Sequence, residues 1–163
     1  EAARLLEVHA ERTPPEQDGR LDNAHASVSL ANLMLRAARP ALAARTLTAS
    51  LRFASCRKDA TLARRLALAR YRSGDLKAGD DASLHLHRLD PKDRAAPYNL
   101  ALSAMQRGNI LEARTWARRG LAQHPRDAGL RRILLQAWLH PVLRFFRGST
   151  DGTTPASDEP KRS

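Results

Sequence analysis

The sequence predicts an all-helical solenoid made of stacked helix pairs, and three observations support that fold class. Gly74 recurs 34 residues later as Gly108, and Pro91 recurs at the same interval as Pro125. Each interval holds two stretches of helical periodicity, one before and one after the glycine. Aromatic residues make up only 4% of the chain, so the core must consist mainly of Ala and Leu, which suits closely packed helices.

The clearest repeat spans residues 94–127. Gly108 can adopt a positive φ and so end the first helix of the pair. Ala113 and Gly120 are small, which lets the two helices approach closely. Pro125 closes the unit because proline cannot continue a helix.

Residues 60–93 and 24–57 are predicted to form two further repeats. The repeat at 60–93 carries Leu86 where a small residue is usual, so we expect the packing there to be looser or shifted by one residue. The repeat at 24–57 lacks a turn glycine and instead places Pro40 in the first turn of its second helix. Proline costs little at that position, because the N–H that it lacks would be unpaired anyway.

The two ends differ from the full repeats. Residues 1–16 fit the second helix of a further repeat, so we expect the matching first helix to lie upstream of Glu1 in a longer protein. Residues 128–147 are expected to form a helix that caps the last apolar face, with its main part ending at Pro141. Residues 148–163 are polar and turn-rich and are expected to be disordered.

The pattern of small, apolar and turn residues in these units resembles the tetratricopeptide repeat family. In the clearest repeat the matching positions are Leu100, Ala101, Gly108, Ala113, Gly120 and Pro125. The resemblance extends over residues 1–140. It implies a right-handed α-solenoid of helix-turn-helix repeats, whose first helices line a concave groove and whose second helices form the convex back.

The resemblance also implies which side chains line the groove, because fixed positions of each first helix face it in this family. The groove residues expected on this basis are Asn32, Arg36, Arg64, Leu68, Tyr71, Arg72, Tyr98, Asn99, Met105, Gln106, Arg132 and Gln136. Arginine and rigid aromatic side chains are good anchors for a bound peptide. We therefore expect the partner to be another protein or peptide segment that carries acidic and apolar groups.

Four of these residues serve as test positions. We expect simultaneous alanine substitutions at Arg64, Tyr71, Arg72 and Tyr98 to abolish partner binding. We also expect each substitution to cost little stability, on the assumption that none of the four side chains is needed for packing between helices.

The function implied is that of a protein–protein interaction scaffold or docking module. A first alternative is a recruiting or positioning appendage of a larger enzyme or membrane protein, whose catalytic or membrane part would lie upstream. The segment itself shows no apolar run near the about 20 residues that a membrane-spanning helix needs.

Nucleic-acid or polyanion binding is a lesser alternative that the charge suggests. The chain carries a formal net charge of +11, and residues 94–147 hold ten Arg against two acidic residues. Such a density could form a phosphate-binding stripe. However, Arg114 and Arg118 lie on a predicted second helix, and so on the convex back, where arginines often serve only solubility. Tyr71, Tyr98 and Trp138 are the candidates for base stacking, whereas Trp116 is expected in the core.

No catalytic residue, metal site or cofactor is predicted. His85 and His87 are two residues apart on a helix and so point to different faces, and they cannot share a metal ion without further ligands. Cys56 is the single cysteine, which excludes an internal disulfide. We therefore expect a protein that is not an enzyme.

Overall fold

The computed structural model describes residues 24–148, with side chains up to residue 139. This part of the chain is entirely helical and contains no strand, which confirms the predicted fold class. The helices are α2 (Ala24–Arg36), α3 (Pro40–Ser50), α4 (Ala54–Arg57), α5 (Ala60–Arg72), α6 (Leu76–Leu89), α7 (Ala95–Gln106), α8 (Ile110–Gln123) and α9 (Ala128–Gly148). The expectations for residues 1–16 and for the tail after residue 148 lie outside the described residues.

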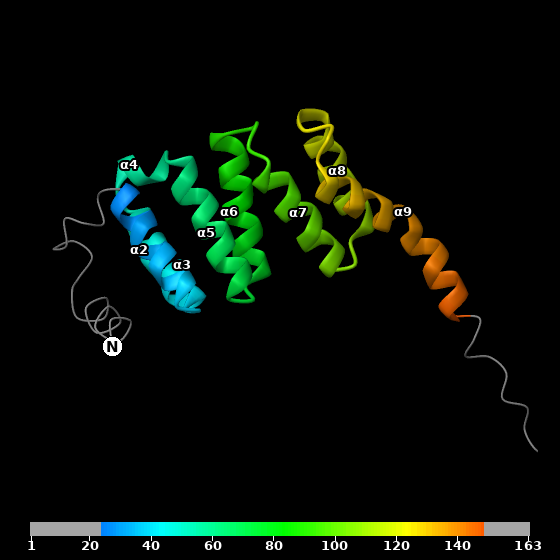
Figure 1. The fold of residues 1–163 in the computed structure, drawn as a ribbon, viewed down its shortest axis with the longest axis horizontal. Helices are drawn as coiled ribbons and strands as arrows, with labels where there is room; N and C mark the ends of the chain where they lie inside the picture. The colour runs from blue at the N-terminus through cyan, green and yellow to red at the C-terminus, as the bar shows by residue number, and fades with distance from the viewer. Residues whose placement is uncertain (1–23, 149–163) are drawn as a thin grey trace, which may run out of the picture.

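The helices form three antiparallel pairs followed by a single helix (Figure 1). Within the pairs, α2 packs on α3, α5 on α6 and α7 on α8. Each second helix also packs on the first helix of the next unit, so that α3 contacts α5, α6 contacts α7 and α8 contacts α9. This succession of neighbours is that of a solenoid, in which each unit buries its apolar face against the next.

The turns inside the pairs are built as the sequence predicts, with one variation. Gly74 and Gly108 adopt φ values of +84° and +74°. In the first pair the same left-handed conformation is taken by Ala38, at φ +56°. An L-residue with a Cβ pays about 1–2 kcal/mol for that conformation. Pro40 then begins α3, as expected for a proline that needs no N–H partner.

An aspartate just before each of the last three first helices caps the helix start with its side chain. Asp59 accepts a hydrogen bond from the Leu62 amide at 2.7 Å, and Asp127 accepts one from the Leu130 amide at 2.9 Å. Asp93 accepts from two amides at the start of α7, at 2.7 and 3.3 Å. These residues lie 34 apart, so the helix N-cap recurs with the repeat.

The core consists of leucines set between alanines. The largest fully buried side chains include Leu47, Leu62, Leu86, Leu100 and Leu130. The expectation of looser packing at Leu86 is wrong. Its side chain is fully buried in a cluster with the alanines at positions 63 and 96, which leave room for it between α5, α6 and α7.

The last helix does not end at Pro141, contrary to the sequence prediction, but continues to Gly148. Proline lacks the N–H that would donate to the carbonyl four residues earlier, which is that of Ala137. Arg114 from α8 donates to this carbonyl instead, through Nε at 3.2 Å and Nη2 at 2.7 Å. The acceptor that the proline leaves open is therefore satisfied by a side chain of the neighbouring helix.

Among residues 24–148, no helix combines the length and apolar content that would let it cross a bilayer.

Candidate binding groove

The first helices α2, α5, α7 and α9 present a series of exposed polar side chains. Of the predicted groove residues, six are exposed on these helices: Arg36, Arg64, Arg72, Gln106, Arg132 and Gln136. The positions of Arg36, Arg72 and Gln106 are equivalent in successive units, each at the C-terminal end of its helix. Exposed side chains thus recur along the array at the same place in each repeat.

Three other predicted residues are partly buried in the packing between helices. Leu68 packs against the core cluster of the first two repeats. Met105 and Tyr98 pack against the cluster formed by α7, α8 and α9. Tyr98 also packs against the start of α9, where a Cβ added to Gly129 would lie 2.7 Å from the tyrosine ring. Asn32, on α2, is partly buried as well.

Tyr71 ties α5 to α6. Its ring lies so close to Gly79 that a Cβ there would come within 2.7 Å of two ring carbons. Its hydroxyl donates to Asp80 Oδ1 at 2.8 Å and lies 3.3 Å from the Ser83 hydroxyl. Burial raises the pKa of the Tyr71 phenol above its usual value. The expectation that Tyr71 is not needed for packing between helices is therefore wrong.

Asp80 extends this contact to the next repeat. Its second carboxylate oxygen forms an ion pair with Arg107, which follows α7. Arg107 also donates to the Ser103 hydroxyl at 2.7 Å and to Glu112 at 3.1 Å. The pair of Tyr71 and Arg107 on one carboxylate thus links α5, α6 and the turn between α7 and α8.

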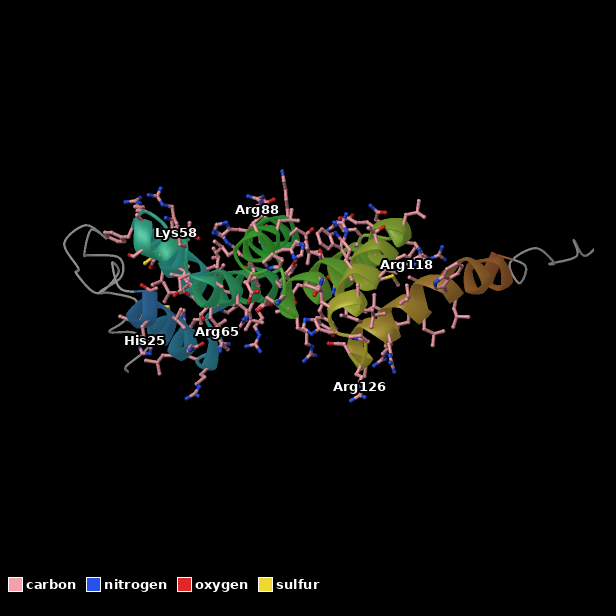
Figure 2. The ribbon with its side chains drawn as sticks, turned by 90° about the horizontal axis from the view of Figure 1, so that it is seen from above. His25, Lys58, Arg65, Arg88, Arg118 and Arg126 are labelled. Atoms are coloured by element: carbon pink, nitrogen blue, oxygen red, sulfur yellow. The ribbon has the colours of Figure 1, made fainter. Side chains whose placement is uncertain are left out.

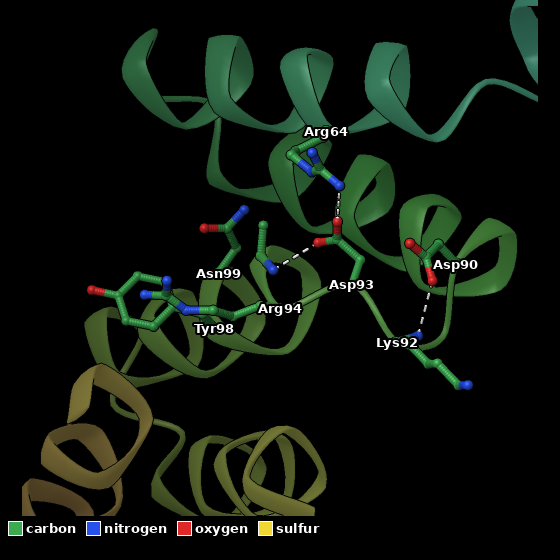
Figure 3. Close-up of a pocket in the computed structure, with 8 residues that line it drawn as sticks. Arg64, Asp90, Lys92, Asp93, Arg94, Tyr98 and Asn99 are labelled. Atoms are coloured by element: carbon green, nitrogen blue, oxygen red, sulfur yellow. Dashed lines mark hydrogen bonds and ion pairs between the residues drawn. The ribbon is translucent and has the colours of Figure 1, made fainter. Parts of the chain in front are cut away.

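An open pocket of ≈ 550 Å³ lies where α5 meets the start of α7. It brings together three predicted groove residues, Arg64, Tyr98 and Asn99 (Figure 3). The other lining residues are Asp90, Lys92, Asp93, Arg94 and Ala95. The pocket therefore combines a tyrosine, an amide and several charged groups from two repeats.

The charge of Arg64 in this pocket is already compensated. Its guanidinium forms an ion pair with Asp93, as Figure 3 shows. The Asp93 side chain is only 4% exposed, whereas that of Arg64 is 44% exposed. The same carboxylate caps α7 through the amides of Ala95 and Ala96. Arg64 is thus held by its own repeat junction and is less free to bind a partner's carboxylate than the sequence suggests.

A second pocket of ≈ 610 Å³ lies at the next junction, before α9. Here Arg94 pairs with Asp127, whose side chain is 3% exposed. Burial by itself would raise the pKa of the Asp127 carboxyl. Hydrogen bonds from the Leu130 amide and from the Arg94 guanidinium outweigh that effect and hold the pKa below its usual value. Arg94 lines both pockets, so the two pockets adjoin at this residue.

This series of arginine–aspartate pairs was not predicted from the sequence. The recurrence of Asp59, Asp93 and Asp127 directly before successive first helices was a usable signal, because aspartate is a strong N-cap residue. The arginine partners could not be found in the same way. Arg64 and Arg94 do not occupy equivalent repeat positions, so their pairing with the two aspartates depends on the packing of the repeats.

Three arginines of α8 stack on tryptophan rings. Trp116 is buried, as predicted, with His87 at 5.5 Å in an edge-to-face contact and Arg119 over its ring at 5.0 Å. Trp138 on α9 is covered by Arg114 at 4.2 Å and by Arg118 at 5.7 Å. The interpretation of Arg114 as a solubilising residue is therefore wrong, since it supports both the backbone and the tryptophan of α9.

Basic side chains project from both sides of the array. In Figure 2, Lys58, Arg88 and Arg118 lie on one side, and His25, Arg65 and Arg126 lie on the other.

Two histidines contact backbone carbonyls at the junctions between repeats. The Nε2 atoms of His85 and His124 lie 2.9 and 2.8 Å from the carbonyls of Arg57 and Lys92. Within the described part of the chain, no group of three His, Cys, Asp or Glu side chains could hold a metal ion.

Comparison with known proteins identifies the fold. No family model matches the sequence, and no curated protein matches it. Among solved structures, MamA superposes with a TM-score of 0.70 at 17% identity, over 82% of this chain and 76% of MamA. The Sgt2 TPR domain from Aspergillus fumigatus gives 0.62 at 17% identity, over 86% of this chain and 89% of that domain.

A third match is the UNC-45 chaperone, described as binding and folding muscle myosin, with a TM-score of 0.64 at 20% identity. The match covers 78% of this chain but only 14% of the chaperone. At such identities the likeness concerns the fold. The chain has the tetratricopeptide-type fold that the sequence predicts.

Proposed function

We propose that this chain is a protein–protein interaction module that binds a segment of another protein along the face of its first helices. The observation that carries this proposal is the pocket of ≈ 550 Å³ in which Arg64, Tyr98 and Asn99 meet, next to exposed side chains that recur on successive helices. Pockets that combine an aromatic side chain with polar groups are typical anchoring points for a bound peptide.

The partner's chemistry follows from the charges that remain free on this face. Among the residues that the structure describes, Arg36, Arg72 and Arg132 are exposed and form no ion pair, in contrast to Arg64. They are therefore the arginines best able to pair with carboxylates of a partner. A segment with acidic residues, and with an apolar side chain for the pocket beside Tyr98, fits this arrangement.

Nucleic-acid binding is the weaker alternative on this structure. A phosphate-binding surface requires basic groups along one continuous path. The basic side chains labelled in Figure 2 instead lie on both sides of the array. The exposed aromatic ring of Trp138 is covered by Arg114 and Arg118, which leaves less of it free for stacking on a base. We further propose that the module is not catalytic and acts by binding alone.

Affinity capture tests the proposal. The full chain is immobilised and exposed to a lysate of the source cell, with and without nuclease. We expect a protein to be retained after nuclease treatment by the unsubstituted chain and to be lost from a variant with Arg36→Ala, Arg72→Ala and Arg132→Ala.

The matched control replaces three exposed arginines outside the first helices, Arg45, Arg52 and Arg88, by alanine. This control removes the same net charge, so it should retain the partner if the first-helix face is the binding surface. Equal loss in both variants would show that general charge, and not this face, is responsible. Release of all bound protein by nuclease would favour the nucleic-acid alternative.

A further inference from the structure

We propose that the outward face of α9 is a second docking site, which takes an acidic amphipathic helix of another protein. The face is formed by Leu135, Trp138 and Leu139, which are 59%, 52% and 46% exposed. The bound helix would pack on α9 as each second helix packs on the first helix of its own repeat. This site adjoins Arg132 and Gln136 of the first-helix face on the same helix, but it rests on Leu135 and Trp138, which that face does not include.

Repeat equivalence shows that this face is normally covered. Ala101 and Ala104 precede Leu135 and Trp138 by 34 residues, and both alanines are fully buried. Ala101 packs in one cluster with Trp116 and with the alanine that follows it on α8. In α9 the equivalent positions carry large apolar side chains that are more than half exposed, although two arginines of α8 contact the ring of Trp138.

The opposite face of α9 already serves the fold. Leu130, Ile133 and Ala137 are buried, and α9 packs on α8 and α7. Leu135 lies on the other side of the helix. Trp138 lies on its flank, where Arg114 and Arg118 of α8 contact the ring while 52% of the residue stays exposed. The C-terminal half of α9 also runs beyond the other helices (Figure 1). The sequence continues the same apolar spacing at Val142 and Phe145.

Charge determines the kind of helix that fits. Residues 128–148 contain no Asp or Glu. The Arg118 guanidinium lies over the Trp138 ring at 5.7 Å from its centre, and Arg131 lies one helical turn before Leu135. Both arginines are exposed and form no ion pair within the described part of the chain. Apolar residues flanked by arginines complement a helix with one apolar face and acidic flanks.

The size of these side chains further defines the occupant. Helix axes lie about 8–10 Å apart depending on the residues between them. Within the repeats, small residues on both helices allow close packing. Because α9 presents leucines and a tryptophan, the bound helix needs small side chains such as Ala directly opposite them, between the larger apolar residues of the same face.

A designed peptide tests this site on the full chain. The probe is a fluorescein-labelled helix of four to five turns, with Ala and Leu along one face and Glu along both flanks. Binding is followed by fluorescence anisotropy at low and moderate salt. A second peptide carries Lys in place of every Glu. We expect the acidic peptide to bind, with affinity that falls as salt rises, and the basic peptide not to bind.

Substitutions on the protein locate the binding. Trp138→Gln with Leu135→Ser should weaken the acidic peptide by roughly thirty-fold or more, because a central tryptophan often dominates an interface. Arg118→Glu should weaken it less and reduce its dependence on salt. Leu33→Ser is the matched control, since Leu33 is 54% exposed on α2 at the other end of the array, and it should leave binding unchanged.

Several outcomes would overturn the proposal. These are no binding of the acidic peptide, equal binding of both peptides, or binding that ignores Leu135 and Trp138. Self-association of the chain that depends on Trp138, measured by analytical ultracentrifugation, would identify a second copy as the occupant. Tighter peptide binding after removal of residues 149–163 would identify the chain's own tail. Competition by a single-stranded oligonucleotide that requires Trp138 would point to nucleic acid.

Circular dichroism of each variant verifies that the fold is kept. Leu135→Ser alone replaces the double variant if the double variant unfolds.

Discussion

At the junction between α6 and α7, Arg64 lies against the buried carboxylate of Asp93, whereas at the end of the array Arg114 and Arg118 lie against the ring of Trp138. In the middle, an arginine and an acid compensate each other, and the acid also caps a helix. At the end, the arginines keep their net charge and instead support a proline-containing helix. Arginine thus forms a neutral ion pair between two repeats in the first region. In the second region it keeps its charge beside exposed apolar side chains.

The largest expected effect comes from exchanging the residue sizes of the two regions. Ala101→Leu places a larger side chain in the fully buried contact between α7 and α8. Overpacking there should lower the free energy of unfolding by about 3 kcal/mol, measured by urea denaturation. The reverse change at the equivalent end position, Leu135→Ala, should cost less than about 0.5 kcal/mol because that side chain is exposed. Similar costs at both positions would mean that the face of α9 is covered.

The junction aspartate gives the next largest effect. Asp93→Ala removes two hydrogen bonds to the start of α7 and the ion-pair partner of Arg64. We expect a loss of about 2 kcal/mol in the free energy of unfolding. Asp90→Ala is the control, since Asp90 accepts a hydrogen bond from the Lys92 amide in the same pocket but caps no helix start. A difference between the two variants too small to measure would contradict the assigned role of Asp93.

The end of the array gives a smaller and more local effect. Arg114→Met removes both hydrogen bonds to the Ala137 carbonyl and leaves that buried acceptor unpaired. We expect a loss of about 1 kcal/mol, together with faster amide hydrogen exchange in α9. Arg118→Met removes only a more distant contact with Trp138 and should change exchange in α9 little. Unchanged exchange in the Arg114 variant would show that the helix passes through Pro141 without this support.

The smallest effect concerns pH. Because the pKa of Asp127 is lowered in the folded protein, its ionised form stabilises the fold above the pKa of the unfolded chain. That contribution is lost as the pH falls through the folded pKa. The stability difference between the chain and Asp127→Asn should therefore be constant near neutral pH and shrink in acid. Thermal unfolding across an acid titration measures it, and a constant difference at every pH would contradict the assignment.

The repeat architecture could be predicted from the sequence because its determinants are local. Gly74, Gly108 and Pro40 act through their own backbone preferences, and the structure places each in the expected turn or first helical turn. Trp116 was correctly expected in the core because its helical periodicity places it on the packed face.

The predictions that failed depend on contacts between distant residues. Pro141 would end a helix by its own preference, but Arg114 supplies the missing donor from another helix. Tyr71 occupies a position that often faces the groove in the repeat family that the sequence resembles, but Gly79 leaves a gap that its ring fills. Arg64 was expected to be available to a partner, but the capping residue of the next helix compensates it. A repeat pattern predicts where a residue lies on its helix. The roles of these residues depend instead on which side chains of other helices they contact.

Photo-crosslinking tests the central claim, binding along the first-helix face, most directly. A photoreactive amino acid replaces Gln106, exposed at the end of α7, or Arg88, exposed on α6. Both variants are irradiated in a lysate of the source cell, and the crosslinked products are identified by mass spectrometry. The account predicts that a defined protein is captured from position 106 and not from position 88. Capture of that protein from position 88 alone, or equally from both positions, would contradict it.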